Sequence, residues 1–393
     1  MVNFTYYTPT KIVFGADTEN QVSELIKEFK GQKVLIHYGQ QSVVKSGLLN
    51  NVKENLKENN IDFELLGGVV ANPLLSKVKE GIALTKAKNI DFVLALGGGS
   101  VIDSAKAIAV GAITNDKVED LIGKKDINQS LPVGAILTIA AAGSEMSATS
   151  VITNDQTLLK RSFSGDAMRP VFAILNPQLT YTLPNYQSAC GAADIIMHTV
   201  ERYFTNAATL DLTDQIAAVL VKNVIKHTKT ILKHPNDYKA RAELMWSGSL
   251  SHNDLTSARS NRGDWAVHQL GHELSAKYNL AHGASLTAIW STWATYAAPC
   301  NQERFLKFAK EVMEVETTDK SDKEVISQGI SKLNNFFKEI GLPTSLKDLK
   351  VNISDQDIDD MTIKASRYHS FKPGNILLLE ESDIKNIYML ANT

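Results

Sequence analysis

Two groups of carboxylate and imidazole side chains in the second half of the chain have spacings that suit a metal ion. In the first group, Asp194 and His198 are four residues apart and therefore share one face of a helix. In the second group, His268 and His272 have the same spacing, and His282 follows them. Since a buried carboxylate is costly without a partner, Asp194 needs one, and a metal ion would be a suitable partner.

The combination of the two groups is what favours a metal site. A single histidine on an apolar helix face is more often a hydrogen-bonded core residue than a ligand. One oxygen and three nitrogens suit Fe²⁺ or Zn²⁺ and leave a coordination position for a substrate oxygen, although spacing alone does not decide which histidines bind. The other histidines have no partner at such spacing and are interpreted as structural or surface groups: His37, His227, His234, His252 and His369.

A run of three glycines, Gly97–Gly99, separates an apolar stretch from the start of an expected helix. Glycine lets the backbone approach a ligand closely, and a helix N-terminus offers unpaired N–H groups to a phosphate. Ser100 can cap this helix or donate to the phosphate. Asp103 either complements the helix dipole or hydrogen-bonds to a bound cofactor. The run matches neither common glycine-rich nucleotide motif, so it does not by itself establish a nucleotide site.

A second turn of small residues, 140–144, follows an apolar stretch at 135–139. Small side chains leave room for a flat ligand, although they also let backbone segments pack closely without one. Ligands of open α/β sheets bind beyond the carboxyl ends of the strands. The two turns together therefore predict a cofactor crevice at the ends of two strands.

In the first half of the chain, expected strands alternate with expected helices, and these elements must position the glycine-rich turns. Short β-branched runs follow longer segments of helical period, which is typical of a parallel sheet with helices on both faces. The expected strands cover 33–38, 61–66 and 92–96, and the expected helices between them cover 47–58 and 75–87.

The pattern changes beyond Pro184, where β-runs disappear and helical periods dominate. The proline-containing loop 175–185 is the natural boundary. We therefore expect an α/β dinucleotide-binding domain over residues 1–184, followed by an all-α metal-binding domain over residues 185–393.

The composition excludes several classes of protein. Of the 393 residues, 44% are hydrophobic and the formal net charge is −2, which excludes a disordered chain and argues against a nucleic-acid partner. No run reaches the roughly 18 apolar residues of a membrane span, and the N-terminus lacks the features of a signal peptide. The two cysteines form no C-x-x-C pair and suit a reducing compartment. We therefore expect a cytoplasmic protein.

Over essentially its whole length, the chain resembles the iron-containing (group III) alcohol dehydrogenases, closest to their butanol dehydrogenase and aldehyde reductase branch. The resemblance implies that family's fold, which dehydroquinate synthase shares. Two of the stretches that carry the resemblance, 191–201 and 268–283, are specific to the family, whereas the glycine-rich stretches are not. These four stretches are 97–106, 143–145, 191–201 and 268–283.

The resemblance assigns roles that spacing leaves open. His272 matches a family histidine that lies beside the metal without binding it, and it is our candidate for relaying the alcohol proton. The implied metal is Fe²⁺, with Zn²⁺ as the alternative. The implied metal ligands are Asp194, His198, His268 and His282.

The family uses NAD or NADP, and most of the matching cofactor residues are present. Many relatives have threonine where this chain has Ala142, so one hydroxyl contact to the cofactor is in doubt. The implied cofactor-binding residues are Gly39, Asn72, Gly98, Gly99, Ser100, Asp103, Thr138, Ser147 and Lys160.

The choice between the two cofactors depends on the residues after the strand at 33–38. A site selective for NAD would place a carboxylate there against the ribose 2′-hydroxyl. This chain has no acid in that stretch, and Ser42 and Lys45 are available for a 2′-phosphate. We therefore expect NADP in preference to NAD, although a lysine such as Lys45 is more commonly a solvated surface group.

The expected activity is the interconversion of primary alcohols, such as butanol, and their aldehydes by hydride transfer to and from nicotinamide. A polyol enzyme of the glycerol dehydrogenase type is the nearest alternative. A dehydroquinate synthase-like lyase would need more basic residues near the metal than Arg202, Arg259 and Arg262. A non-catalytic scaffold would not need two complete sites. The resemblance also implies a homodimer, formed through an N-terminal β-run over Phe4–Phe14.

Overall fold

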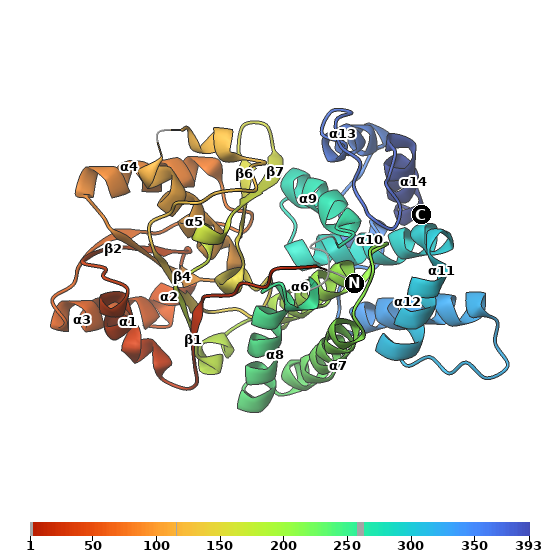
Figure 1. The fold of residues 1–393 in the computed structure, drawn as a ribbon, viewed down its shortest axis with the longest axis horizontal. Helices are drawn as coiled ribbons and strands as arrows, with labels where there is room; N and C mark the ends of the chain where they lie inside the picture. Colours follow the sequence, from red (N-terminus) through yellow and green to blue (C-terminus); the bar gives the residue numbers. More distant parts are fainter. Residues whose placement is uncertain (1–2, 115, 258–262) are drawn as a thin grey trace. The chain divides into compact units, whose positions relative to one another are not determined.

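The computed structural model describes residues 3–114, 116–257 and 263–393 (Figure 1). The chain divides into two units. The N-terminal unit comprises Tyr7–Leu183, and the C-terminal unit comprises Pro184–Thr393 together with the described residues before Tyr7. None of the described helices combines the length and the apolar character that crossing a membrane requires.

A six-stranded parallel sheet with the strand order β1-β8-β5-β4-β2-β3 forms the centre of the N-terminal unit. The central strand β4 is buried along its whole length, as expected for a strand covered on both faces. The strands are β1 (Lys11–Phe14), β2 (Lys33–Tyr38), β3 (Asp62–Leu66), β4 (Phe92–Gly97), β5 (Val133–Leu137) and β8 (Phe172–Leu175).

Helices cover both faces of this sheet. On one face, α1 (Val22–Glu28) and α3 (Leu48–Glu58) bury their apolar stripes against β2 and β4 in a single hydrophobic core. On the other face lie α4 (Leu75–Lys88) and α5 (Gly99–Ile113), which pack against each other (Figure 1). The single turn α2 (Ser42–Lys45) follows β2 directly.

Most of the expected strands and helices of this unit are present within a residue or two, but the N-terminal β-run is shorter than expected and several further elements were not expected. The β-run expected over Phe4–Phe14 is a strand only at Lys11–Phe14. Pro9 has no N–H to donate to a strand ladder, which disfavours a longer strand. The sequence-based expectations lack helix α1, strand β8 and the antiparallel hairpin of β6 (Thr149–Asn154) and β7 (Leu159–Ser164).

Every element assigned among the described residues of the C-terminal unit after Pro184 is helical, so the predicted fold class is confirmed. The almost wholly buried α6 packs against α7, α8 and α10. The helices are α6 (Asn185–Tyr203), α7 (Asp211–Lys233), α8 (Tyr238–Ser251), α9 (Ala266–Tyr278), α10 (His282–Ala297), α11 (Gln302–Lys307), α12 (Asp322–Glu339), α13 (Asp355–Ala365) and α14 (Glu381–Ala391).

Candidate metal centre and cofactor turn

Two of the predicted metal ligands lie on one buried face of α6. Asp194 and His198 are each only 5% exposed. The Oδ1 atom of Asp194 is 3.4 Å from Nε2 of His198, because residues one helical turn apart point to the same side. The intervening residues Ile195, Ile196 and Met197 are fully buried, so the helix brings the carboxylate out of contact with water.

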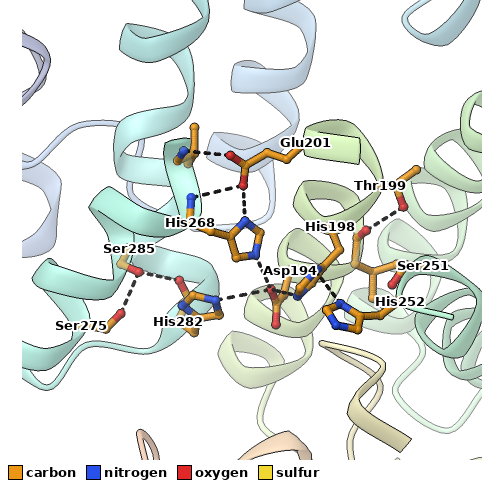
Figure 2. A network of polar contacts seen from close by, with 12 residues as sticks. Asp194, His198, Thr199, Glu201, Ser251, His252, His268, Ser275, His282 and Ser285 are labelled. Atoms are coloured by element: carbon orange, nitrogen blue, oxygen red, sulfur yellow. Dashed lines mark hydrogen bonds and ion pairs between the residues drawn. The ribbon is translucent and has the colours of Figure 1, made fainter. Parts of the chain in front are cut away.

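The other two predicted ligands come from α9 and α10. The Nε2 atoms of His268 and His282 lie 3.7 and 3.8 Å from Oδ1 of Asp194. A Cβ atom at Gly283 would lie 2.1 Å from the carbonyl oxygen of Cys190, so glycine is required for α10 to begin this close to α6. Figure 2 shows the four side chains converging on one point.

This arrangement fits a bound cation. The ligand atoms of Asp194, His268 and His282 all lie within 4.8 Å of one another. Within the described residues, Oδ1 of Asp194 and Nε2 of His268 are buried and have no hydrogen-bond partner. Buried polar atoms are costly without a partner, and a metal ion would supply one to both. One carboxylate oxygen and three imidazole nitrogens suit Fe²⁺ or Zn²⁺. The structure thus brings the four residues together, and their role as ligands stays a prediction.

Glu201 is a residue of this centre to which sequence reasoning gave no role. Its fully buried carboxylate accepts hydrogen bonds from the backbone N–H groups of Val267 and His268, at 2.8 and 3.2 Å. The same carboxylate also contacts Nδ1 of His268 through Oε2 (Figure 2). The sequence could have indicated this residue, because Glu201 is seven residues after Asp194 and so lies on the same face of α6.

His252, which was interpreted as a structural or surface histidine, lies against a predicted ligand. Its Nδ1 atom is 2.8 Å from Nδ1 of His198 (Figure 2). The guanidinium of Arg202 donates to the carbonyl oxygen of His198 at 3.0 Å and to Nδ1 of His252 at 3.2 Å. Arg202 also lies over the ring of Trp265, 4.6 Å from its centroid. No local spacing relates His252 to His198, so the sequence offered no signal for this contact.

His272 lies close to the four predicted ligands. Its ring centroid is 5.3 Å from that of His282 and 6.3 Å from that of His268. It is buried and lies one turn after His268 on α9. The group of convergent ligand atoms formed by Asp194, His268 and His282 includes neither His272 nor His198, although Nε2 of His198 is 3.4 Å from Oδ1 of Asp194. The position of His272 suits the predicted proton relay, which stays a prediction.

The two buried imidazoles His198 and His268 have opposite electrostatic environments. Burial, followed by the neighbouring His252 and His268, lowers the pKa of His198 well below its ordinary value. Burial alone would also lower the pKa of His268, but the carboxylates of Glu201 and Asp194 outweigh it and raise that pKa to about 9. A cation bound at Nε2 of His268 would take the place of the proton there, because histidine binds metals as the neutral imidazole.

The predicted cofactor residues of the N-terminal unit cluster after the carboxyl ends of three adjacent strands. Gly39 follows β2, and a Cβ atom there would lie 3.7 Å from the carbonyl oxygen of Val69 and 4.0 Å from the side chain of Val101 in α5. Gly98 precedes α5, where a Cβ atom would lie 2.3 Å from the side chain of Ile139, so only glycine fits. Thr138 follows β5, and its N–H group donates to the carbonyl oxygen of Gly97. Gly99 and Ser100 form the first turn of α5, while the exposed Ser42 begins α2.

Asp103 and Ser147 are engaged with the protein itself. The carboxylate of Asp103 accepts hydrogen bonds from Oγ of Ser144 at 2.5 Å and from the N–H group of Val151 at 3.0 Å. These bonds correspond to neither of the two roles expected from the sequence, and Asp103 does not lie in the first turn of α5, which contains no acidic residue. The carbonyl oxygen of Ser147 accepts a hydrogen bond from the buried ammonium group of Lys106. Sequence reasoning gave no role to Lys106.

Asn72 and Lys160 are far apart in the sequence but in direct contact. The ammonium group of Lys160 donates to Oδ1 of Asn72 at 2.8 Å, and both residues are buried. The contact joins the segment before α4 to strand β7. The structure therefore brings together two residues that only the family resemblance had connected, and their binding to a cofactor stays a prediction.

Comparison with known proteins gives matches along nearly the whole chain. A family model for iron-containing alcohol dehydrogenase matches residues 9–177, and a model for the C-terminal part of the Fe-containing alcohol dehydrogenase family matches residues 188–391. NADH-dependent butanol dehydrogenase A from Clostridium acetobutylicum is 36% identical over 391 residues, which cover 99% of each chain.

Two further proteins are similar to this chain over most of its length. The NADPH-dependent aldehyde reductase YqhD from Escherichia coli is 36% identical over 352 residues, which cover 88% of this chain and 89% of the reductase. The crystal structure of NADH-dependent butanol dehydrogenase A from Thermotoga maritima matches with a TM-score of 0.95 at 37% identity. That match covers 100% of this chain and 99% of the Thermotoga chain.

Proposed function

Because the chain belongs to the iron-containing alcohol dehydrogenase family, we propose that it is a metal-dependent, NAD(P)-linked enzyme that interconverts primary alcohols and their aldehydes. Butanol and butanal are the proposed model substrates, since similar proteins are a butanol dehydrogenase and an aldehyde reductase. The observation that carries the proposal is that the side chains of Asp194, His198, His268 and His282 converge. Two of their buried atoms, Oδ1 of Asp194 and Nε2 of His268, have no hydrogen-bond partner among the described residues.

In this proposal the four converging side chains hold the metal. When bound, the metal would supply a Lewis acid for the alcohol or aldehyde oxygen, and the nicotinamide cofactor would supply the hydride acceptor or donor. Asp194 provides the only charged ligand, and the three imidazoles are neutral, so the ion keeps most of its positive charge. His272 accepts the alcohol proton or returns it, because its ring lies next to that of His282 and an imidazole can act as both proton acceptor and donor.

The proposed cofactor is NADP in preference to NAD. The residues from Tyr38 to Lys45 include no carboxylate that could bind a ribose 2′-hydroxyl. Ser42 and Lys45 lie on α2, directly after β2, where a 2′-phosphate could be bound. Similar proteins are named for either NADH or NADPH, so a direct comparison of KM values is required. The proposal expects the lower KM for NADPH.

We also propose that the enzyme is a cytoplasmic homodimer that contains Fe²⁺ and can accept Zn²⁺. Strand β1 is at the end of the sheet order and pairs with β8 along one side. Phe14 in β1 and Tyr7 before it are exposed. An exposed strand edge can pair with another chain, so a second copy of this protein is the proposed partner. The free cysteines Cys190 and Cys300 suit the reducing cytoplasm.

The contacts of Arg202 argue against the lyase alternative. A polyanionic substrate would need cationic groups near the metal, but Arg202 is engaged with His198, His252 and Trp265. The other two arginines considered for this role, Arg259 and Arg262, lie outside the described residues. No observation favours a polyol over a simple alcohol, so that alternative is left to a substrate panel.

The test is butanal reduction by chelator-treated protein that is refilled anaerobically with Fe²⁺ or Zn²⁺, with NADPH and NADH compared. We expect turnover only with metal, and we expect it to be lost in Asp194→Ala, which removes the charged ligand. If the refilled protein binds metal and nucleotide but does not reduce butanal, the proposed substrate is wrong. Glycerol and related polyols would then be tested.

A further inference from the structure

We propose that Glu201 is a positioning residue that fixes the tautomer of His268 and thereby sets the affinity of the centre for its metal. This inference rests on the proposed function, because it assumes that His268 is a ligand. Glu201 itself is not part of the convergent group of Asp194, His268 and His282. It acts through His268, whose ring lies between Glu201 and Asp194 (Figure 2).

The first part of the argument is the direction of the hydrogen bond. A carboxylate can only accept, so Nδ1 of His268 must carry the proton that faces Glu201. Once a neutral ring has its proton at Nδ1, the Nε2 atom presents a lone pair. That lone pair is directed toward Asp194 Oδ1, 3.7 Å away. Glu201 therefore selects the one neutral tautomer in which Nε2 of His268 can bind a cation.

The second part of the argument is that Glu201 is itself held rigidly. Its Oε1 atom accepts from the N–H group of Val267, and its Oε2 atom accepts from the N–H group of His268. These N–H groups belong to the first turn of α9, which has no intrahelical acceptors for them. The carboxylate thus caps α9 from α6 and holds the ring of His268 with the same two oxygens.

The third part of the argument is charge. Asp194 and Glu201 are both buried carboxylates, and they lie against opposite nitrogens of the His268 ring. A divalent cation bound at Nε2 of His268 would gain from both negative charges. Outer carboxylates of this kind typically change metal affinity by about 10–100-fold when they are replaced. Glu201 is the outer carboxylate that contacts Nδ1 of His268.

The test measures Zn²⁺ affinity by competition with a chromophoric chelator under anaerobic conditions, without substrate. We expect Glu201→Gln to weaken Zn²⁺ binding by about 10–100-fold. The visible spectrum of the Co²⁺-substituted protein should also change, because the ring of His268 is no longer fixed. Asp214→Asn is the matched control. Asp214 is also a fully buried carboxylate of the C-terminal unit, bonded to Arg304 and Lys307, and its loss should lower stability without changing Zn²⁺ affinity.

Two outcomes would overturn the inference. One is a folded Glu201→Gln protein with the Zn²⁺ affinity and Co²⁺ spectrum of the wild type. The other is an equal loss of affinity in Asp214→Asn, which would indicate general destabilisation. If Glu201→Gln does not fold, histidine ¹⁵N NMR of the wild-type Zn²⁺ protein decides, since a proton at Nε2 of His268 would refute the inference. Wild-type protein that binds Zn²⁺ but reduces no aldehyde would refute the proposed function alone.

Discussion

His37 should make the stability of the N-terminal unit depend on pH. It lies in β2, one residue before the end of the strand that leads to Gly39. Its Nδ1 atom is 2.9 Å from the carbonyl oxygen of Leu66, and its Nε2 atom is 2.8 Å from Oγ of Ser104 in α5. A carbonyl only accepts, so Nδ1 donates and Nε2 accepts from Ser104. The neutral ring therefore connects β3, β2 and the helix of the cofactor turn.

The size of the effect follows from the pKa of His37. Burial lowers this pKa from 6.5 to about 4. In the unfolded chain His37 is protonated below pH 6.5, whereas in the folded unit it stays neutral down to about pH 4. The unfolded state thus binds more protons in this interval, and stability is lost as the pH falls from 6.5 to 4. At 1.36 kcal/mol per pH unit, the loss amounts to about 3 kcal/mol.

The assay is urea unfolding between pH 7 and pH 4, with wild type and His37→Asn compared. All four tryptophans belong to the C-terminal unit, so their fluorescence would not report on His37. Hydrogen exchange of the β2 and β4 peptides reports on the N-terminal unit instead. We expect the wild type to lose about 3 kcal/mol more than the variant over this range. Equal pH dependence in the two proteins would refute the reasoning.

Three further predictions concern buried groups. Lys106→Met should lower the stability of the N-terminal unit, measured by urea unfolding, because the buried carbonyl oxygens of Ser147 and Thr149 lose the ammonium donor, at about 1–3 kcal/mol for each acceptor left unsatisfied. His272→Ala should lower kcat by about 10²–10⁴-fold, because the proposed proton relay is lost. Its metal content, measured by atomic absorption, should be unchanged, and loss of metal would contradict the proton-relay role. His252→Ala should weaken Zn²⁺ binding in the chelator assay, by less than Glu201→Gln, because a neutral partner of a ligand is lost rather than a charged one.

The parts of the fold that were predicted correctly are those with a local signal. β4 is a continuous apolar run that ends at glycine, and α4 follows Pro73, so periodicity and turn residues locate both. Helical periods dominate the sequence from Ala189 to about Lys229, whereas the structure contains two helices there, α6 and α7, separated by 204–210. In that gap Thr205 and the N–H group of Asn206 bond to the side chain of Asn375. Such a contact between residues distant in sequence has no local signal.

The same distinction applies to the candidate site. Asp194 and His198 could be paired from their spacing because both lie on one helix. That His268 and His282 join them depends on the packing of three helices, for which sequence supplied only a family resemblance. Contacts such as that between His252 and His198 arise entirely from tertiary packing, which a single sequence does not reveal.

The outer partners of the imidazoles decide how the centre can bind a metal. If His198 binds through Nε2, its proton is on Nδ1 and must be donated to Nδ1 of His252. The guanidinium of Arg202, which can only donate, faces the Nδ1 atoms of both His198 and His252, at 3.3 and 3.2 Å. Arg202 therefore does not select which of these two rings carries the proton at Nδ1. Glu201 can only accept, so it does select the tautomer of His268 and leaves a lone pair on Nε2 directed toward Asp194.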